Sequence, residues 1–326
     1  MSKWIGRRES IGIGAESTRG VGVAATYWLN VLSFSFADQP TKARSEAGFG
    51  GIWGGDQAPM VYQHAEGDME VELGDSSFGV ILKALLGTVS TANNGDSTYT
   101  HTYTLQNDNA HDSLSIHTVD PIGNLIFELS MIDSLVLNIT PENIISYTVT
   151  FKSKSSQASA GETVTYTSEN KFLGRHLTFK VAATTADLTA ASKVNLKSLS
   201  LTFEKNAEIE TVLSTSQPED IVNKMFNIKG EITLNYEDRT WLNYVKDGTY
   251  RAIRIQLTNT DETIGSGSQN PDFKIDLSKC DFDAWDPDFA MDDLARQTLT
   301  FQALYDAGGN DNLINSCTLI NTVVSY

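Results

Sequence analysis

The sequence predicts a mainly β fold: two tandem β-sandwich or barrel domains, each with one short flanking helix, that arise from an internal duplication. Two observations support this prediction. Period-two alternation of apolar and polar residues, which is typical of half-buried strands, recurs along the chain. In addition, one strand–helix stretch, residues 67–87, occurs a second time at residues 230–248.

The stretch GDMEVELGDSSFGVILKALLG, residues 67–87, predicts a strand followed by a helix. Asp68, Glu70 and Glu72 alternate with apolar residues, so the strand has one acidic and one apolar face. The polar run DSS precedes apolar residues at helical spacing and predicts side chains that cap the helix. Gly87 is expected to end that helix.

The stretch GEITLNYEDRTWLNYVKDG, residues 230–248, keeps the strand phase, the cap and the helix face of the first stretch. The flanking strands correspond as well, Ser33–Phe36 with Ser200–Phe203 and Tyr147–Phe151 with Gln297–Phe301. The loops differ in length while the order of elements is kept. We therefore expect duplication of a whole domain, and not a short solenoid repeat.

Composition and turn signals divide the chain into an arm, two domains and a linker. Residues 1–28 form a glycine-rich N-terminal segment, an extended arm that is expected to pack on another molecule. The first domain, 29–153, contains a long irregular loop at 37–66; a small, polar linker covers 154–161, and the second domain covers 162–326. Strands are expected at Tyr27–Phe36, Ser97–Thr104, Ser113–Thr118, Asn124–Met131, Ser134–Ile139, Ile144–Lys152, Thr163–Thr167, His176–Ala182, Lys197–Phe203, Asn227–Tyr236, Tyr250–Leu257, Phe273–Leu277, Leu294–Leu304 and Leu319–Val324, and the second helix at Asp238–Lys246.

The composition excludes several classes of function. A net charge of −17 on 326 residues argues against nucleic-acid binding, because such proteins carry basic patches for phosphates. No apolar run reaches the roughly 20 residues that a membrane span needs. The N-terminus has no apolar core behind its basic residues, as a signal peptide would. We expect a protein made in a cytoplasm, without a membrane partner.

No motif for catalysis or metal binding is found. The five histidines lack any ligand spacing, and no nucleophile signature is present. Cys280 and Cys317 are expected to be reduced, partly buried thiols. The acidic cluster Asp281–Asp293 departs from the EF-hand pattern, so a solvated acidic loop is expected there. We predict no enzyme, no cofactor and no metal site.

Four segments carry a resemblance to a known family. They are IGIGAESTRGVGVA near the N-terminus, the strand–helix stretch 67–87, THTYTL from Thr100, and the Leu-Thr-Phe strand at 299–301. On these segments the chain resembles the tail tube (major tail) proteins of long-tailed bacteriophages. The resemblance implies a β-sandwich with one flanking helix that closes with its neighbours into rings. Stacked rings form a hollow tube for DNA, bridged by arms and long loops.

The resemblance further implies a non-enzymatic virion protein, assembled in the host cytoplasm, whose other partners are tail proteins at the tube ends. Two domains per chain predict homotrimeric rings with pseudo-sixfold symmetry, with a homohexamer as the alternative. Double-stranded DNA passes through without specific binding. A carbohydrate-binding or adhesin-type β-sandwich module of a virion or secretion apparatus is the alternative function.

Two sets of residues are expected to serve the tube. Residues on the polar faces of the two repeated strands are expected to line an acidic lumen: Asp68, Glu70, Glu72, Glu231, Thr233 and Asn235. Residues of the N-terminal arm, 1–28, and of the long loop, 37–66, are expected to make contacts between rings: Trp4, Arg7, Arg8, Phe49, Ile52 and Trp53. A chain lacking residues 1–20 is expected to fold but not to polymerise.

Overall fold

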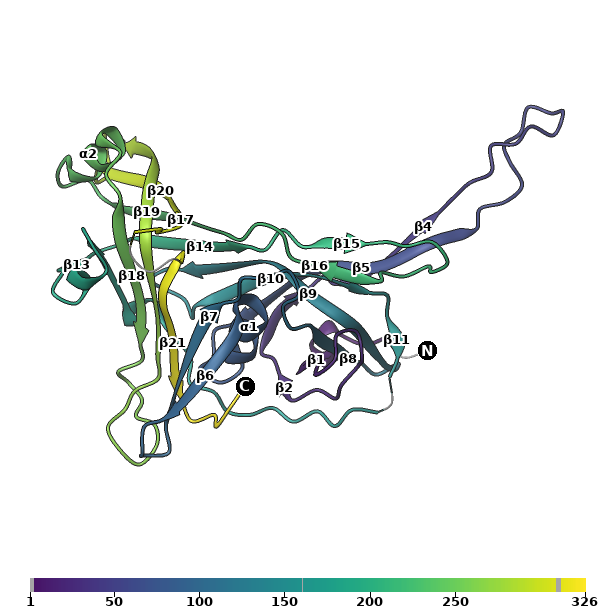
Figure 1. Cartoon of the computed structure of the whole chain (residues 1–326), viewed down its shortest axis with the longest axis horizontal. Coiled ribbons are helices and arrows are strands. Elements are labelled where there is room, and N and C mark those ends of the chain that lie inside the picture. Colours follow the sequence, from purple (N-terminus) through teal and green to yellow (C-terminus); the bar gives the residue numbers. More distant parts are fainter. Residues whose placement is uncertain (1–2, 160, 309–311) are drawn as a thin grey trace.

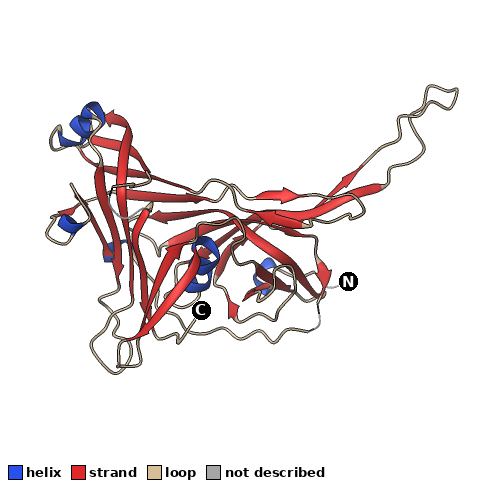
Figure 2. Ribbon diagram, viewed as in Figure 1, coloured by secondary structure: helices blue, strands red, loops and turns tan. Residues whose placement is uncertain are grey.

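A computed structural model describes residues 3–159, 161–308 and 312–326 and shows a mainly β chain (Figures 1 and 2). One antiparallel sheet contains 19 strands, and a small hairpin adds two more. The two α-helices are short, α1 (Phe78–Leu86) and α2 (Thr240–Asp247). Within the described ranges, no helix is long and apolar enough to cross a membrane. The predicted fold class, mainly β with two short helices, is confirmed.

Eight strands form a continuous sheet that we call the main sheet. Four come from each half of the chain, and each strand is antiparallel to its neighbours. In spatial order they are β3 (Val31–Phe34), β5 (Met60–Glu72), β10 (Ser146–Lys154), β9 (Asn124–Ile139), β14 (Ser198–Glu204), β17 (Asn227–Asn235), β20 (Arg296–Ala303) and the C-terminal part of β19 (Asp272–Asp288).

The two halves meet where β9 pairs with β14, and we call this pairing the internal seam. Its register runs from Ile139 opposite Leu199 to Ser134 opposite Glu204. The halves therefore share one sheet and one hydrophobic core. This differs from the expectation of two domains separated by a linker.

The outer strands pair in the same order in both halves. In the first half, β2 (Tyr27–Trp28) pairs with β1 (Ser10–Ala15), β1 with β8 (Leu114–Val119), and β8 with β9. In the second half, β13 (Lys193–Val194) pairs with β12 (Leu177–Ala182), β12 with β18 (Arg251–Thr258), and β18 with β19.

The remaining strands complete both halves. β11 (Gln157–Ala158) pairs with β9 as β21 (Ile314–Asn321) pairs with β19. Hairpins follow the first main-sheet strand of each half: β4 (Ala37–Lys42) with β5, and β15 (Glu208–Glu210) with β16 (Asp220–Val222). The hairpin of β6 (Gly87–Asn93) and β7 (Tyr99–Leu105) belongs to the first half but pairs with β21 of the second.

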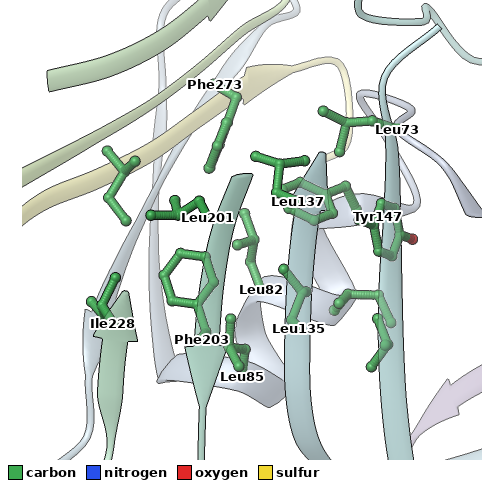
Figure 3. Packing of buried hydrophobic residues seen from close by; sticks show 14 of the residues in the cluster. Leu73, Leu82, Leu85, Leu135, Leu137, Tyr147, Leu201, Phe203, Ile228 and Phe273 are labelled. Carbon is green, nitrogen blue, oxygen red and sulfur yellow. The ribbon is translucent and has the colours of Figure 1, made fainter. Parts of the chain in front are cut away.

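Helix α1 packs across the internal seam. Figure 3 shows Leu82 and Leu85 of α1 between the leucines of β9 and the apolar residues of β14. The apolar residues predicted for the first repeated strand are buried there as well, because alternate side chains of a strand share one face. Each fully buried Leu, Ile or Phe contributes about 1.5–3 kcal/mol, so this helix ties the two halves together.

The expected linker and the first strand after it are wrong. Two parts of this segment belong to the sheet: β10 continues to Lys154, and β11 follows at Gln157–Ala158. Ser153 and Ser155 are buried. The strand expected at Thr163–Thr167 is absent, and those residues are extended without ladder partners.

Two expected loops contain strands. The segment 37–66 forms a long hairpin, because β4 and the first part of β5 pair from Ala37 opposite Glu66 to Lys42 opposite Met60. The acidic segment from Asp281 continues β19 as far as Asp288, and only the residues after it form a loop. Asp281, Asp286 and Asp288 share the polar face of this strand, and a bulge at Asp283 interrupts the period-two pattern between them.

The cap of α1 comes from a distant residue. Ser77 donates from its backbone N–H and its hydroxyl to the carboxylate of Glu169, at 2.7 and 3.0 Å, so the local Asp-Ser-Ser run does not cap the helix by itself. Gly87 ends the helix with a φ of 99°, as expected.

The flanking correspondence also needs a correction. Phe34 lies opposite Met69, whereas Leu199, and not Leu201, lies opposite the equivalent Ile232. The match between β3 and β14 therefore shifts by two residues, which keeps every side chain on its face.

Candidate functional site

The six residues expected to line a lumen lie together on the polar face of the main sheet, away from α1. Asp68 of β5 accepts a hydrogen bond from the Thr150 hydroxyl at 2.6 Å, and Glu70 accepts one from Ser146 at 3.1 Å. Glu72 lies 3.6 Å from Lys171. Hydroxyl groups of β10 thus separate the carboxylates of β5 from the centre of the sheet.

The second strand carries less charge. Glu231 lies between Ser200 and Thr300, Thr233 shares a 3.2 Å hydrogen bond with Thr298, and Asn235 lies opposite Arg296. Cross-strand pairs of this kind contribute about 0.2–1 kcal/mol each. The face is therefore a hydroxyl surface with carboxylates concentrated on β5 and on the C-terminal part of β19.

The basic groups of this face are paired. Lys229 donates to both carboxylate oxygens of Glu204, at 3.0 and 2.8 Å, and Arg296 lies 3.3 Å from Asp293. Asp283 is the extra residue of a bulge in β19, and burial together with Asp281 raises its pKa. Few positive charges on this face are free to meet an anionic polymer.

The long hairpin of β4 and β5 projects far from the body of the protein, and we call it the arm (Figure 1). Its ladder continues through hydrogen bonds from Ala43 to Pro59 and from Ser45 to Gln57. Phe49, Ile52 and Trp53, three of the residues expected to contact another ring, are exposed near its tip. Exposed apolar side chains on a long projection are typical of a contact surface.

The second hairpin supports the base of the arm. Gln63 of β5 donates to the carbonyl of Ser216, between β15 and β16, at 2.8 Å. Both hairpins therefore leave the main sheet on the same side (Figure 1).

The N-terminal residues are part of the fold, which corrects the expectation of an external arm. β1 pairs along its length with β8, and Ile11 and Ile13 are buried. The buried Glu16 carboxylate accepts hydrogen bonds from Ser113, Ser115 and two backbone N–H groups. Removing residues 1–20 would leave the donors of Ser113, Ser115 and Leu129 unpaired, so the truncated chain is not expected to fold.

The other expected contact residues, Trp4, Arg7 and Arg8, belong to the N-terminal segment and not to the arm. Arg7 lines a groove with Gly6, Leu32 and Phe34, so it lies beside β3. Arg7 and Arg8 form no ion pair with a described residue. Trp4 is half-buried.

The main sheet has two open edges, which the sequence did not reveal. β3 pairs with β5 alone, and residues 284–288 of β19 pair with β20 alone, among the described strands. The run Asp286-Pro287-Asp288 was the available signal, because proline and charge in a strand are typical of an edge.

The five histidines have structural partners. His101 lies 3.0 Å from Asn321, and His176 lies 2.9 Å from Asp261. Both cysteines are free and buried, and burial raises the pKa of Cys317 to about 12. In the described part of the chain, no group of three His, Cys, Asp or Glu side chains is placed to hold a metal ion.

Comparison with known proteins finds a family match. Residues 6–303 match a family model described as phage tail tube protein. A search of curated proteins found no match. Since the match covers most of the sequence, the chain belongs to the phage tail tube protein family: it is a non-enzymatic structural subunit that polymerises into the tube of the virion tail.

Proposed function

We propose that the chain builds the tube as rings of three subunits and that the polar face of the main sheet lines the bore. The observation that carries this proposal is the strand order of the main sheet. β3, β5, β10 and β9 of the first half have the same neighbours as β14, β17, β20 and β19 of the second. This order supports an internal duplication.

Three such chains would supply about 24 strands to one closed barrel. At a spacing of about 4.8 Å and a tilt of about 40°, the backbone diameter is about 48 Å. Side chains of about 5 Å on each wall leave about 38 Å, which admits duplex DNA. Closure removes the open edges, which are otherwise sites of uncontrolled pairing. The ring has threefold symmetry by chain and pseudo-sixfold symmetry by strand order.

The polar face faces the bore in this arrangement because the opposite face is already covered. Helix α1 and the hydrophobic core cover the apolar face, with Met69, Val71 and Leu73 buried beneath them. Carboxylates on the bore repel phosphate within about a Debye length, roughly 8 Å at physiological salt. Hydroxyl groups carry no charge that would attract it. DNA can then slide without the counterion release that lysine and arginine contacts produce.

The arm joins successive rings. It continues the line of β5 beyond the sheet, and Phe49, Ile52 and Trp53 are exposed on it in the described subunit. Burying these side chains on the next ring would remove a large apolar surface from water, which stabilises the stack.

A cross-section of assembled tubes tests the proposal. Cryo-electron microscopy is expected to show three chains per ring, six similar units around the axis, and Glu70 directed to the lumen. Rings of six whole chains would overturn the stoichiometry, and Glu70 on the outer wall would overturn the lumen assignment.

A further inference from the structure

We infer that neighbouring subunits join by repeating the internal seam: residues 284–289 of one chain pair with residues 34–39 of a second copy, in the register that joins β9 to β14. This inference rests on the proposed ring. It names the two surfaces that meet, their register, and the groove that the partner fills.

The direction of the strands permits this joint. Neighbouring strands of the main sheet alternate in direction, so β3 at one end and β19 at the other are antiparallel to each other when two copies lie side by side. The internal seam joins the equivalent strands, β14 and β9, in the same way.

The equivalences fix a register. The bulge that follows Thr150 opposite β9 recurs in β19 between Phe282 and Ala284, so Asn138 corresponds to Asp288. On the other edge, Phe34 lies opposite Met69, and Leu199 lies opposite Ile232, the residue equivalent to Met69. Phe34 therefore corresponds to Leu199, and Ser35 to Ser200. Since Asn138 lies opposite Ser200, Asp288 is assigned to Ser35 of the neighbour.

Exposed apolar residues are explained by this register. Ile139 and Leu199 lie opposite each other in the internal seam and are 3% and 2% exposed. Their equivalents are Phe289, which is 55% exposed, and the half-buried Phe34. Pairing of two copies would bury Phe289 and Phe34, just as the internal seam buries Ile139 and Leu199.

The groove at the open edge, about 530 Å³, has a smaller counterpart of about 160 Å³ at the seam, where Thr140 and Pro141 form one wall. Gly174 begins the 3₁₀ turn η2 (Gly174–His176), and a side chain there would collide with the carbonyl of Thr140 and with Pro141. Gly6 begins the equivalent turn η1 (Gly6–Arg8), yet a Cβ at Gly6 would meet nothing within 4 Å.

The missing wall belongs to the second copy. Thr140 and Pro141 follow β9 as Ala290 and Met291 follow β19, and Met291 is fully exposed. The groove over Gly6 is lined by Arg7, which forms no ion pair with a described residue, and also by Glu9 and Glu72. The fit of the two edges therefore rests on the strand register and on the shape of the groove.

Cysteine pairs test the register. Ser35→Cys with Asp288→Cys is expected to cross-link neighbouring chains under mild oxidation or with a short bifunctional thiol reagent, as read on a non-reducing gel. Asn138→Cys with Ser200→Cys is the matched control within one chain, where the hydroxyl and amide oxygens are 3.0 Å apart. Ser35→Cys with Asp286→Cys, two residues out of register, should give at least tenfold less cross-linked product.

The outcomes separate the joint from the ring. Tubes with three chains per ring in which Ser35 and Asp288 do not cross-link, while the Asp286 pair does, would overturn the register and leave the proposed function intact. Cross-linked closed rings of six chains would keep the joint and overturn the trimer.

A glycine pair gives a second readout. Gly6→Leu should leave the denaturation midpoint of the unassembled subunit unchanged and abolish ring formation. Gly174→Leu should lower the midpoint of the subunit itself. Normal tubes from Gly6→Leu would contradict the groove assignment.

Discussion

Helices α1 and α2 follow equivalent strands in the two halves but differ in burial. Eight of the nine residues of α1 are buried, whereas Trp241 is the one buried residue of α2. Helix α1 lies over the internal seam and is covered by the second half, while α2 packs on Phe282 of β19, beside an open edge. The second half of the chain therefore completes the core around α1, as the contacts of Phe273 and Lys205 with this helix show.

The comparison extends to the strands before these helices. β5 presents Asp68, Glu70 and Glu72 on its polar face, whereas β17 presents one carboxylate, Glu231. The first half also carries the long arm, and the second half only the short hairpin. The two halves therefore share a strand order but differ in structure. The first half has a buried helix and the projecting arm, and the second half has an exposed helix beside an open edge.

The largest expected effect comes from the first residue of the core helix. Phe78 packs against Tyr147 and Phe273 with ring centroids 5.0 and 5.3 Å away, so Phe78→Ala should lower the free energy of unfolding by about 3–5 kcal/mol. Trp241→Ala, at the corresponding position of α2, should cost at most about half as much. Urea unfolding of the unassembled subunit measures both, and equal losses would contradict the difference in burial between the two helices.

A buried lysine of the second half, which contacts α1, should make the stability of the subunit depend on pH. The ammonium group of Lys205 donates to the carbonyl of Ala84 in the last turn of α1 at 2.8 Å, and burial lowers its pKa to about 7. In the unfolded chain the pKa is about 10.4. Above pH 7 the unfolded chain binds more protons at this site, so stability rises with pH, by about 2 kcal/mol between pH 7 and pH 9.

Lys205→Met is the control for that prediction. The difference between the parent and the variant isolates the lysine from tyrosines and cysteines that titrate in the same range. The parent should gain stability relative to the variant as the pH rises from 7 to 9. Parallel profiles would mean that Lys205 keeps its ordinary pKa in the folded subunit.

The smallest effect on stability, and a distinct effect on function, is expected on the polar face. Glu70→Lys leaves the core face untouched and should change the free energy of unfolding by less than about 0.5 kcal/mol. Tubes should assemble, but DNA ejection should slow, because lysine adds phosphate contacts. Thr233→Lys places the same charge at the equivalent position of the second half, and Glu70→Gln is the control without a new positive charge. Ejection at the parental rate from both lysine variants would contradict a lumenal face.

Local sequence determined the elements whose pattern is complete within a few residues. The alternation around Met69, Val71 and Leu73 determined which face of β5 is buried, because the period of a strand is fixed by its geometry. Gly87 and Gly248 determined where the helices end, since both adopt a positive φ that other residues avoid. The similarity of residues 67–87 and 230–248 also located the two equivalent strands.

Tertiary structure decided what the same pattern is used for. The cap of α1 by Glu169, the burial of Lys205 under Ala84, and the continuation of β19 through Asp288 all depend on residues far apart in the chain. No local pattern encodes such contacts, because their free energy arises only when the partner strand or helix is in place. For the same reason, the sequence did not distinguish the linker from a sheet strand, or the open edges from the internal seam. A strand has two hydrogen-bonding sides, and only the assembled sheet determines which of them is occupied.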